Sequence, residues 1–477
     1  MEIKLLLTQP HILSGNLSEN YKTIQYFLTL AEKTDASYVF FPKDTLTGNN
    51  LGTLSEQDDF QQDVAKLNSE LQKENKHHLQ IIFSDDYNLC GYHIKPKSVG
   101  ISFSGKNIKV HTGGSAILDD KGEKLFQLKL FQQDALELTF DTQTFQITSG
   151  DYQQENYDDT GILYHTLRLG LKEFLNQTGI KRMTVGLSGG IDSAVAAALY
   201  VDILGANNVL LLNMPNKYNS QITQQLAQIT AQNLGAKYAV IPISDSVNNT
   251  IQTIENIGLT VNTLTEENIQ ARDRSSRLIA AASAAFGGAF SANGNKAELS
   301  VGYATFYGDL AGAVAPLGDL WKHQVYALGK YFNKEVFKKD TIHEAIFQIR
   351  PSAELSEQQT VGKGGDPLYY PYHDYLFNAF TKNISLSQIA KWYKKDSLEE
   401  NLGCNKNILR IIFKNNHLEF FADLEHWWYA YHSIAVAKRL QAPPIIIVSD
   451  NPLNTTEPQL KPYFSEEYIK IKKSIIE

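Results

Sequence analysis

The sequence predicts an α/β protein with a doubly wound parallel sheet, preceded by a smaller α/β domain. Continuous apolar runs at residues 183–187, 209–214 and 238–243 alternate with helical stretches. Such runs are typical of parallel strands that are buried on both faces. The chain has 477 residues with 43% hydrophobic content, which is enough for the cores of two or three domains.

The smaller domain is expected at residues 1–145. Short apolar runs bounded by turn residues predict its strands, and Asp120-Lys121-Gly122 predicts a hairpin turn. The predicted strands cover residues 3–7, 38–42, 79–83, 99–103, 108–110, 115–118 and 136–140, and the predicted helices cover about 18–34 and 57–75. The polar stretch at 146–159 predicts a linker.

The larger domain is expected at residues 160–477, and its central strand runs straight into a glycine turn. After the apolar run come Ser188, Gly189 and Gly190, followed by an alanine-rich stretch, so we expect a strand, a tight turn and a helix. The other predicted elements are helices over about 162–177, up to about 204–205 and over 220–235, and strands at 209–214 and 238–243.

This glycine turn predicts an anion site. Two adjacent glycines let the backbone bend tightly and bring its N–H groups close to a ligand. Ser188 and Ser193 add hydroxyl donors at a helix start, where unpaired N–H groups and the helix dipole favour negative charge. We therefore expect a phosphate group here.

Other loop types compete for the same residues. A Walker loop needs a lysine before its Ser/Thr, but Asp192 precedes Ser193, and the spacing of a Rossmann fingerprint is not present. Residues Gly186 to Gly190 do fit Gly-x-Ser-x-Gly, so a serine hydrolase with a His-containing triad stays open. The lack of a His-Gly-Gly-Gly oxyanion segment argues against that alternative.

Composition excludes several other classes. The net charge is −8 without a basic stripe, which argues against nucleic-acid binding. Cys90 and Cys404 are the only cysteines and lie far apart, so neither a disulfide framework nor a cysteine metal site is indicated. We see neither a signal-peptide layout nor an apolar membrane span, and expect a cytoplasmic protein with no membrane partner.

The string Ser-Gly-Gly-Ile-Asp-Ser at 188–193 resembles the pyrophosphate loop of the ATP-pyrophosphatase enzymes, which activate a carboxyl group by adenylation. Three further segments resemble those of NAD synthetases within this group. They are Asn-Ile-Gln-Ala-Arg-Asp-Arg at 268–274, Asn-Gly-Asn-Lys-Ala-Glu at 293–298 and Arg-Pro-Ser-Ala-Glu-Leu at 350–355. The resemblance implies an adenine-nucleotide alpha hydrolase-like fold for the larger domain.

The resemblance also implies roles for individual residues. Ser188, Asp192, Glu298 and Lys322 would be catalytic, and Asp192 and Glu298 would hold Mg²⁺. The residues implied to bind the substrate ATP are Gly186, Ser188, Gly189, Gly190, Asp192, Ser193, Met214, Asn293, Lys322 and Ser352. Those implied to bind the acid substrate are Asn268, Arg272, Glu298, Tyr303, Ala304, Thr305 and Phe306.

Two departures from the family pattern concern the larger domain. Asn293 replaces a threonine that contacts ATP, although its amide can still form hydrogen bonds. In the divergent C-terminal tail, Gln-Ala-Pro-Pro at 441–444 matches the family, but isoleucines at 445–447 stand where a substrate-binding lysine should follow.

The smaller domain looks like a truncated, degenerate nitrilase-type amidase, the glutaminase half of glutamine-dependent NAD synthetases. Its Phe-Pro-Lys-Asp-Thr-Leu-Thr-Gly at 41–48 resembles the family's Phe-Pro-Glu-x-x-Leu-Thr-Gly, and Gly113-Gly114-Ser115 also matches. However, Lys43 replaces the general-base glutamate, and the stretch that should carry the nucleophilic cysteine is deleted. Cys90 lacks the expected neighbours, so we expect it to be a structural thiol and the domain to be inactive.

The implied reaction is ATP-dependent amidation of nicotinic acid adenine dinucleotide to NAD with ammonia. It proceeds through an acyl-adenylate and releases pyrophosphate and AMP. The missing tail lysine leaves nicotinic acid mononucleotide open as the substrate, and a non-catalytic nucleotide-binding relative is a third possibility. The resemblance also implies a homo-oligomer, at least a dimer.

Overall fold

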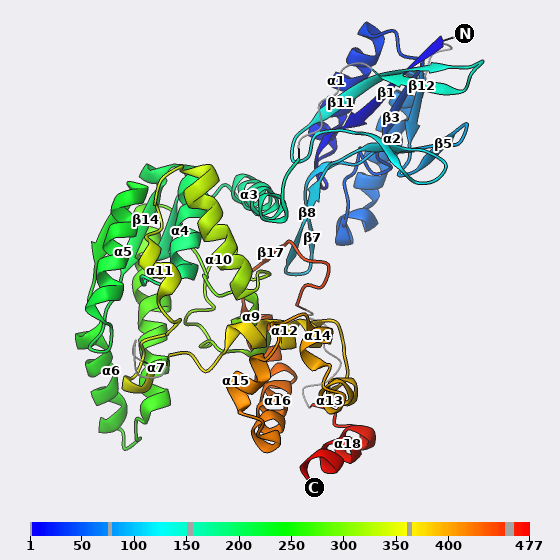
Figure 1. The fold of residues 1–477 in the computed structure, drawn as a ribbon. Helices are drawn as coiled ribbons and strands as arrows, with labels where there is room; N and C mark the ends of the chain where they lie inside the picture. The colour runs from blue at the N-terminus through cyan, green and yellow to red at the C-terminus, as the bar shows by residue number, and fades with distance from the viewer. Residues whose placement is uncertain (1, 75–78, 150–155, 360–364, 454–461) are drawn as a thin grey trace. The chain divides into compact units, whose positions relative to one another are not determined.

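The computed structural model describes residues 2–74, 79–149, 156–359, 365–453 and 462–477. The chain divides into two compact units, Met1–Phe174 and Leu175–Glu477. Each unit has its own main sheet (Figure 1). The division falls inside helix α3 (Asp159–Thr178), so the domain limits expected from the sequence stay predictions.

The main sheet of the first unit is buried on both faces. The three consecutive leucines of β1 show this: Leu6 packs with α1 residues such as Phe27, whereas Leu5 and Leu7 belong to a separate core with Phe40. Strands β1, β3 and β4 are parallel, and β11 and β12 are added antiparallel. The elements are β1 (Glu2–Gln9), β3 (Tyr38–Phe41), β4 (Gln80–Phe83), β11 (Asp134–Asp141), β12 (Gln146–Ser149), α1 (Leu17–Lys33) and α2 (Asp58–Glu74).

Several short strands of this unit were not predicted. The sequence stretch expected to begin the linker forms β12, which pairs with β11 through Ile147 and Phe140, while residues 150–155 lie outside the described part. The predicted hairpin at Asp120 is confirmed between β9 (Ala116–Leu118) and β10 (Lys124–Gln127). The remaining elements are β2 (His11–Leu13), β5 (Tyr87–Leu89), β6 (Tyr92–Lys95), β7 (Val99–Ser104), β8 (Asn107–Thr112) and η1 (Gly52–Glu56).

The second unit contains the predicted parallel sheet, with strand order β15-β14-β13-β16. All five residues of β14 are buried, as expected for a strand covered on both faces. The predicted α/β fold class is therefore confirmed. The elements are β13 (Met183–Gly186), β14 (Val209–Asn213), β15 (Lys237–Val240), β16 (Ala289–Phe290), α4 (Ile191–Leu204), η2 (Ala206–Asn208), α5 (Gln221–Leu234), α6 (Ser244–Asn256) and α8 (Ala280–Phe286).

Shorter helices after the sheet carry most of the remaining candidate residues. Helix α7 continues into a π-helical turn, η3, which changes the direction of the side chains that follow. These elements are α7 (Thr263–Arg272), η3 (Asp273–Ile279), α9 (Lys296–Val301), α10 (Lys322–Tyr331), η4 (Phe332–Val336), α11 (Glu344–Gln348) and η5 (Glu357–Gln359).

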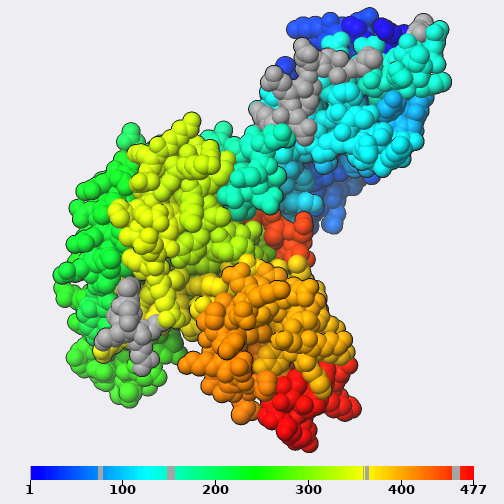
Figure 2. Space-filling view, viewed as in Figure 1, coloured from blue at the N-terminus to red at the C-terminus, as the bar shows by residue number. Residues whose placement is uncertain are grey.

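The last part of the chain forms a helical block around an aromatic core that includes Tyr372, Phe377 and Phe420, coloured orange to red in Figure 2. Its elements are α12 (Tyr370–Thr381), α13 (Leu386–Lys394), α14 (Leu398–Leu402), α15 (Ile408–Phe413), α16 (His417–Tyr431), α17 (Ile434–Gln441), β17 (Ile445–Ile447) and α18 (Glu466–Ile476). Among the helices that could be inspected, we find none with the length and apolar character needed to cross a bilayer.

Candidate active site

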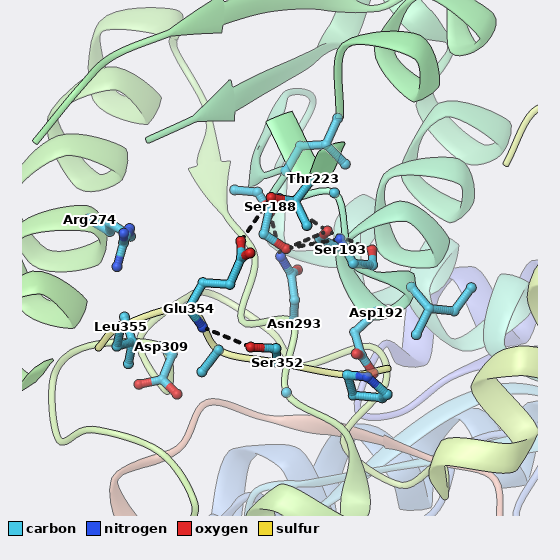
Figure 3. Close-up of a pocket in the computed structure, with 18 of the residues that line it drawn as sticks. Ser188, Asp192, Ser193, Thr223, Arg274, Asn293, Asp309, Ser352, Glu354 and Leu355 are labelled. Carbon is cyan, nitrogen blue, oxygen red and sulfur yellow. Dashed lines mark hydrogen bonds between the residues drawn. The ribbon is translucent and has the colours of Figure 1, made fainter. Parts of the chain in front are cut away.

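A cavity of about 320 Å³ opens beside the glycine turn, at the carboxyl ends of β13 and β14. Its walls come from the turn itself, from the Arg350–Leu355 segment and from side chains that include Glu298 and Lys322. Figure 3 shows Ser188 and Ser193 of the turn with Ser352, Glu354 and Arg274 around the cavity. Ligands of open parallel sheets bind at this edge. The cavity therefore lies where the sequence predicts a binding site.

The glycine turn is held by its own serines and by close packing. Gly189 has φ +89°, and a Cβ atom there would lie 2.0 Å from the carbonyl oxygen of Thr223, so only glycine fits. The Ser188 and Ser193 hydroxyls lie 3.1 Å apart. Because the N-cap of α4 is Gly190, which has no side chain to cap the helix, the first N–H groups of α4 are left for a ligand.

A cluster of buried charges faces this turn. Lys322 Nζ lies 2.5 Å from Asp192 Oδ2 and 3.7 Å from Glu298 Oε1, and Lys322 is only 3% exposed. Asn295 Nδ2 donates to both carboxylates, over 3.0 Å to Asp192 and 2.9 Å to Glu298. The predicted pair Asp192 and Glu298 thus shares one site.

Helix starts put these side chains in place. Asn295 caps α9, and Glu298 closes a capping box by accepting the Asn295 backbone N–H over 3.2 Å. Lys322 is the first residue of α10, and Asp192 lies in the first turn of α4. Three helix ends therefore deliver the charged groups to one point.

A third carboxylate, Asp366, extends the cluster. It accepts hydrogen bonds from the hydroxyls of Tyr303 (3.3 Å) and Tyr370 (3.1 Å), and Tyr370 also donates to Glu298 Oε1 over 3.2 Å. Burial, with the nearby Asp192 charge, raises the pKa of Glu298 to about 8, and burial also raises the pKa of Asp366. Burial alone would lower the pKa of Lys322, but its carboxylate neighbours raise it.

The donor set fits a divalent cation. When ionised, the three carboxylates exceed the single ammonium in charge, and carboxylate oxygens are the ligands that Mg²⁺ prefers. Within the described residues, no group of three or more Asp, Glu, His or Cys side chains is arranged to hold a metal alone. Asp192 and Glu298 would supply two ligands, and Mg²⁺ commonly completes its shell with water and phosphate oxygens.

The predicted ATP residues converge on the cavity, and most predicted residues for the acid substrate do not. The predicted residues that line the cavity are Gly186, Ser188, Gly189, Gly190, Asp192, Ser193, Met214, Asn293, Glu298, Tyr303, Lys322 and Ser352. Outside this lining lie Asn268, Arg272, Ala304, Thr305 and Phe306.

Four of those outer residues form a second group. The Thr305 hydroxyl donates to Asn268 Oδ1 over 2.9 Å, and Arg272 Nε donates to the Phe306 carbonyl over 3.1 Å. Thr305 therefore contacts Asn268, and Arg272 contacts Phe306, while their role in binding the acid substrate stays a prediction. Asn268 and Arg272 lie on α7, whose N-cap is Asn262, and the Asn262 side chain accepts the Thr265 N–H over 2.9 Å.

A family model described as NAD synthase matches residues 163–417, which is more than half of the chain. The chain belongs to the NAD synthase family. It is 35% identical over 256 residues to the glutamine-dependent NAD(+) synthetase of Synechocystis sp., covering 54% of this chain and 45% of that protein. It is 31% identical over 289 residues to that of Thermotoga maritima, covering 54% and 50%. The chain spans about half the length of the curated relatives it matches.

Two solved structures share the fold of this NAD synthase family member. One is a glutamine-dependent NAD+ synthetase from Acinetobacter baumannii in complex with ADP, with TM-score 0.64, 20% identity and coverage of 97% of this chain and 98% of that chain. The other is from Cytophaga hutchinsonii, with TM-score 0.72, 13% identity and full coverage of both chains. At these identities the likeness establishes the fold alone.

The sequence interpretation missed four side chains of the NAD synthase site: Asn295, Asp366, Arg274 and Glu354. Three of them, Asn295, Arg274 and Glu354, stood in recognised motifs without a role, and capping-box spacing pointed to Asn295. Arg274 follows the motif arginine onto the π-helical turn, where its Nε donates to the Met214 carbonyl over 2.9 Å and burial lowers its pKa to about 10. No sequence signal marked Asp366.

The side chains of two residues predicted to bind ATP already form hydrogen bonds within the chain. Asn293 Nδ2 donates to the Gly186 carbonyl over 3.2 Å, while its buried Oδ1 is without a partner in the described part of the chain. The Ser352 hydroxyl donates to the carbonyl of Gln359. Ser188 is paired with another serine rather than with an imidazole, which gives the serine-hydrolase alternative no support.

In the first unit, the segments that resemble a nitrilase-type amidase lie at the surface or form packing and hydrogen-bond contacts. Lys43 is exposed, and Gln9 fills the space beside Gly113, with Ser115 donating its N–H to Gln9 Oε1 over 2.8 Å. Cys90 is exposed in the turn between β5 and β6 with φ +52°. Cys90 therefore takes no part in a core, and the expectation that it is not a nucleophile stays a prediction.

Proposed function

We propose that this NAD synthase family member catalyses the ATP-dependent amidation of nicotinic acid adenine dinucleotide to NAD. The substrate carboxylate attacks the α-phosphate of ATP and releases pyrophosphate, and ammonia then displaces AMP from the acyl-adenylate. The observation that carries this proposal is the cavity in which a glycine turn faces the buried Lys322, held by Asp192 and Glu298.

The first step must bring two anions together, a carboxylate and a polyphosphate. Lys322 and the free N–H groups at the start of α4 supply positive charge and donors for the phosphates, in a partly enclosed site where such interactions are strong. Asn295 holds Asp192 and Glu298 in position. A Mg²⁺ ion bound by Asp192 and Glu298 would neutralise phosphate charge and orient the leaving group.

The pyridine acid is proposed to bind through Tyr303 and the neighbouring group of Asn268, Arg272, Ala304, Thr305 and Phe306. Tyr303 is the link, because it lines the cavity and donates to Asp366. The other members are not part of the cavity lining; among them Thr305 contacts Asn268, and Arg272 contacts Phe306. This arrangement supports a long substrate whose carboxylate enters the cavity while its remainder lies outside. We also propose assembly as at least a dimer.

Free ammonia is the proposed nitrogen donor. The curated relatives are named glutamine-dependent, but this chain has the exposed Lys43 in place of a carboxylate base. Cys90 is exposed in a turn, and its side chain has no hydrogen-bond or ion-pair partner among the described residues. The first unit is therefore proposed to have no glutaminase activity of its own.

The decisive experiment measures AMP release by the purified protein with ATP, Mg²⁺, ammonium and nicotinic acid adenine dinucleotide. We expect AMP and NAD in equal amounts, and no AMP when the acid is left out. ATP binding without AMP release would reject the reaction and favour a non-catalytic nucleotide-binding protein. If glutamine supports turnover as well as ammonium does, only the proposal that free ammonia is the nitrogen donor is rejected.

The mononucleotide is a second candidate for the acid substrate. The isoleucines that replace the family's tail lysine are largely buried, with Ile445 at 7% and Ile446 at 0% exposure, so they cannot hold an anionic group. Comparing kcat/KM for the mononucleotide and dinucleotide acids decides between them, and we expect the dinucleotide to be preferred.

A further inference from the structure

Glu354 places a buried carboxylate beside the cavity, only 3% exposed. Its Oε2 accepts hydrogen bonds from the Thr223 hydroxyl (2.8 Å) and from Asn219 Nδ2 (3.1 Å), and its Oε1 accepts the Ser220 N–H over 3.2 Å. The three donors lie at or just before the start of α5, and Figure 3 shows Thr223 beside Glu354. The carboxylate therefore joins the Arg350–Leu355 segment to one helix end.

That helix end also touches the phosphate-binding elements. The Thr223 carbonyl is the atom against which Gly189 packs, at a distance that leaves no room for a side chain. Asn219 Oδ1 accepts a hydrogen bond from Arg274 Nη2 over 3.3 Å. A shift at the start of α5 would therefore move both the glycine turn and the Arg274 guanidinium.

The backbone at Glu354 supports a specific role. Its φ is +47°, in the left-handed region that a glutamate rarely adopts, and the Glu354 N–H donates to Ser352 Oγ over 3.4 Å. Such a conformation persists only where surrounding contacts impose it, and it is common at ligand sites. The three hydrogen bonds of the carboxylate are the contacts that impose it here.

We infer that Glu354 is a positioning residue that fixes the Arg350–Leu355 segment against the start of α5, so that Ser352 and the glycine turn hold ATP from two sides. This inference rests on the proposed function, because it assumes that both elements bind ATP. Glu354 does not itself contact the phosphates in this scheme. Both of its oxygens are occupied by donors of α5, and a direct approach of carboxylate to phosphate would be repulsive.

The chemistry explains why a carboxylate is needed. Both oxygens of the Glu354 carboxylate accept hydrogen bonds. A glutamine at this position has one acceptor oxygen, and its amide N–H₂ would face a hydroxyl, an amide or a backbone N–H that also needs an acceptor. Glu354→Gln therefore keeps the size of the side chain but breaks the connection, whereas Glu354→Asp keeps both acceptor oxygens.

The experiment measures the Kd of ATP and of nicotinic acid adenine dinucleotide, separately, by titration calorimetry for the full chain and its variants. For Glu354→Gln we expect the Kd of ATP to rise about tenfold, as for a buried hydrogen-bond set left unpaired. The Kd of the acid should stay unchanged. Glu354→Asp should recover part of the ATP affinity, and Glu344→Gln, an exposed glutamate on α11, should match the wild type.

A double-mutant cycle with Thr223→Val tests whether the effect passes through this contact. Thr223→Val removes the hydroxyl donor but keeps the shape, so its effect and that of Glu354→Gln should not add. Unchanged ATP affinity in Glu354→Gln would overturn the inference, and so would additive effects. If Glu354→Gln loses affinity for ATP and for the acid equally and its Tm is lowered, the role of Glu354 is merely structural.

The outcomes separate this inference from the proposed function. If the wild type binds ATP but releases no AMP, the reaction is rejected while the variant comparison of ATP affinity still stands. If the wild type forms NAD and Glu354→Gln binds ATP normally, only the positioning role is rejected. A wild type that does not bind ATP overturns both.

Discussion

The two compact units use buried polar side chains in opposite ways. In the first unit they mainly satisfy backbone groups: the Thr8 hydroxyl donates to the Phe40 carbonyl over 2.7 Å, and Gln9 Nε2 donates to the Lys129 carbonyl over 2.5 Å. In the second unit, Lys322 and its carboxylates contact one another at the wall of a cavity. Polar groups paired with the backbone stabilise a fold, whereas opposed charges at a cavity are typical of chemistry.

The strongest test of this difference removes the single cation of the cluster. Lys322→Met should lower the rate of AMP release by about a thousandfold, because it removes phosphate charge stabilisation and leaves two half-buried carboxylates without their partner. Lys330→Met, at an exposed position on the same helix, is the matched control and should retain activity. Equal rates for both variants would contradict the role of the cluster.

Removing one negative charge should have a smaller effect. Glu298→Gln keeps an acceptor for the Asn295 N–H and so preserves the helix cap, but it supplies a weaker cation ligand. We expect kcat to fall about a hundredfold and the Mg²⁺ concentration for half-maximal rate to rise. Glu335→Gln, at an exposed position, should leave both values unchanged. An unaltered Mg²⁺ dependence would argue against Glu298 as a ligand.

The buried charges should also make stability depend on pH when divalent cations are removed with EDTA. The pKa of Glu298 is raised from 4.5 to about 8, so the folded state binds more protons than the unfolded state between these values. Stability is then highest below pH 4.5 and falls as the pH rises toward 8. We expect Tm to drop by a few degrees over this range, and less in Glu298→Gln. If Tm falls equally steeply with pH in the wild type and in Glu298→Gln, the effect does not come from Glu298.

The smallest effect is expected in the first unit. Cys90→Ser should leave ammonium-supported turnover unchanged, because this exposed turn residue has no part in the proposed reaction. Glutamine should support little turnover in either protein. Loss of a glutamine-supported rate on this single substitution would show that the first unit retains a nucleophile after all.

The fold of the second unit could be predicted because its signals are local. The buried strand Val209–Asn213 shows as an apolar run of four residues that ends at Asn213, and the glycine turn has its own chemistry. The first unit was harder to predict. Its strands β2, β5 and β6 are three or four residues long, and β12 carries the polar composition of a linker, so pairing rather than sequence defines them.

The site could be predicted only in part, for a related reason. Asp192, Glu298 and Lys322 stand in recognisable segments, and they meet in space as expected. Asp366 has no motif, and it joins the site only because α12 and the loop after α9 bring tyrosine hydroxyls to it. Glu354 acts through contacts with α5, more than a hundred residues earlier in the chain, which no local pattern reveals.

The capping box of α9 has one more consequence. The same Glu298 carboxylate accepts the Asn295 backbone N–H and faces Lys322, so it serves the helix end and the reaction centre together. A ligand that draws this carboxylate toward the cavity must loosen the first turn of α9. The exchange rate of the Asn295 amide proton with solvent would then report occupancy of the site from within the backbone.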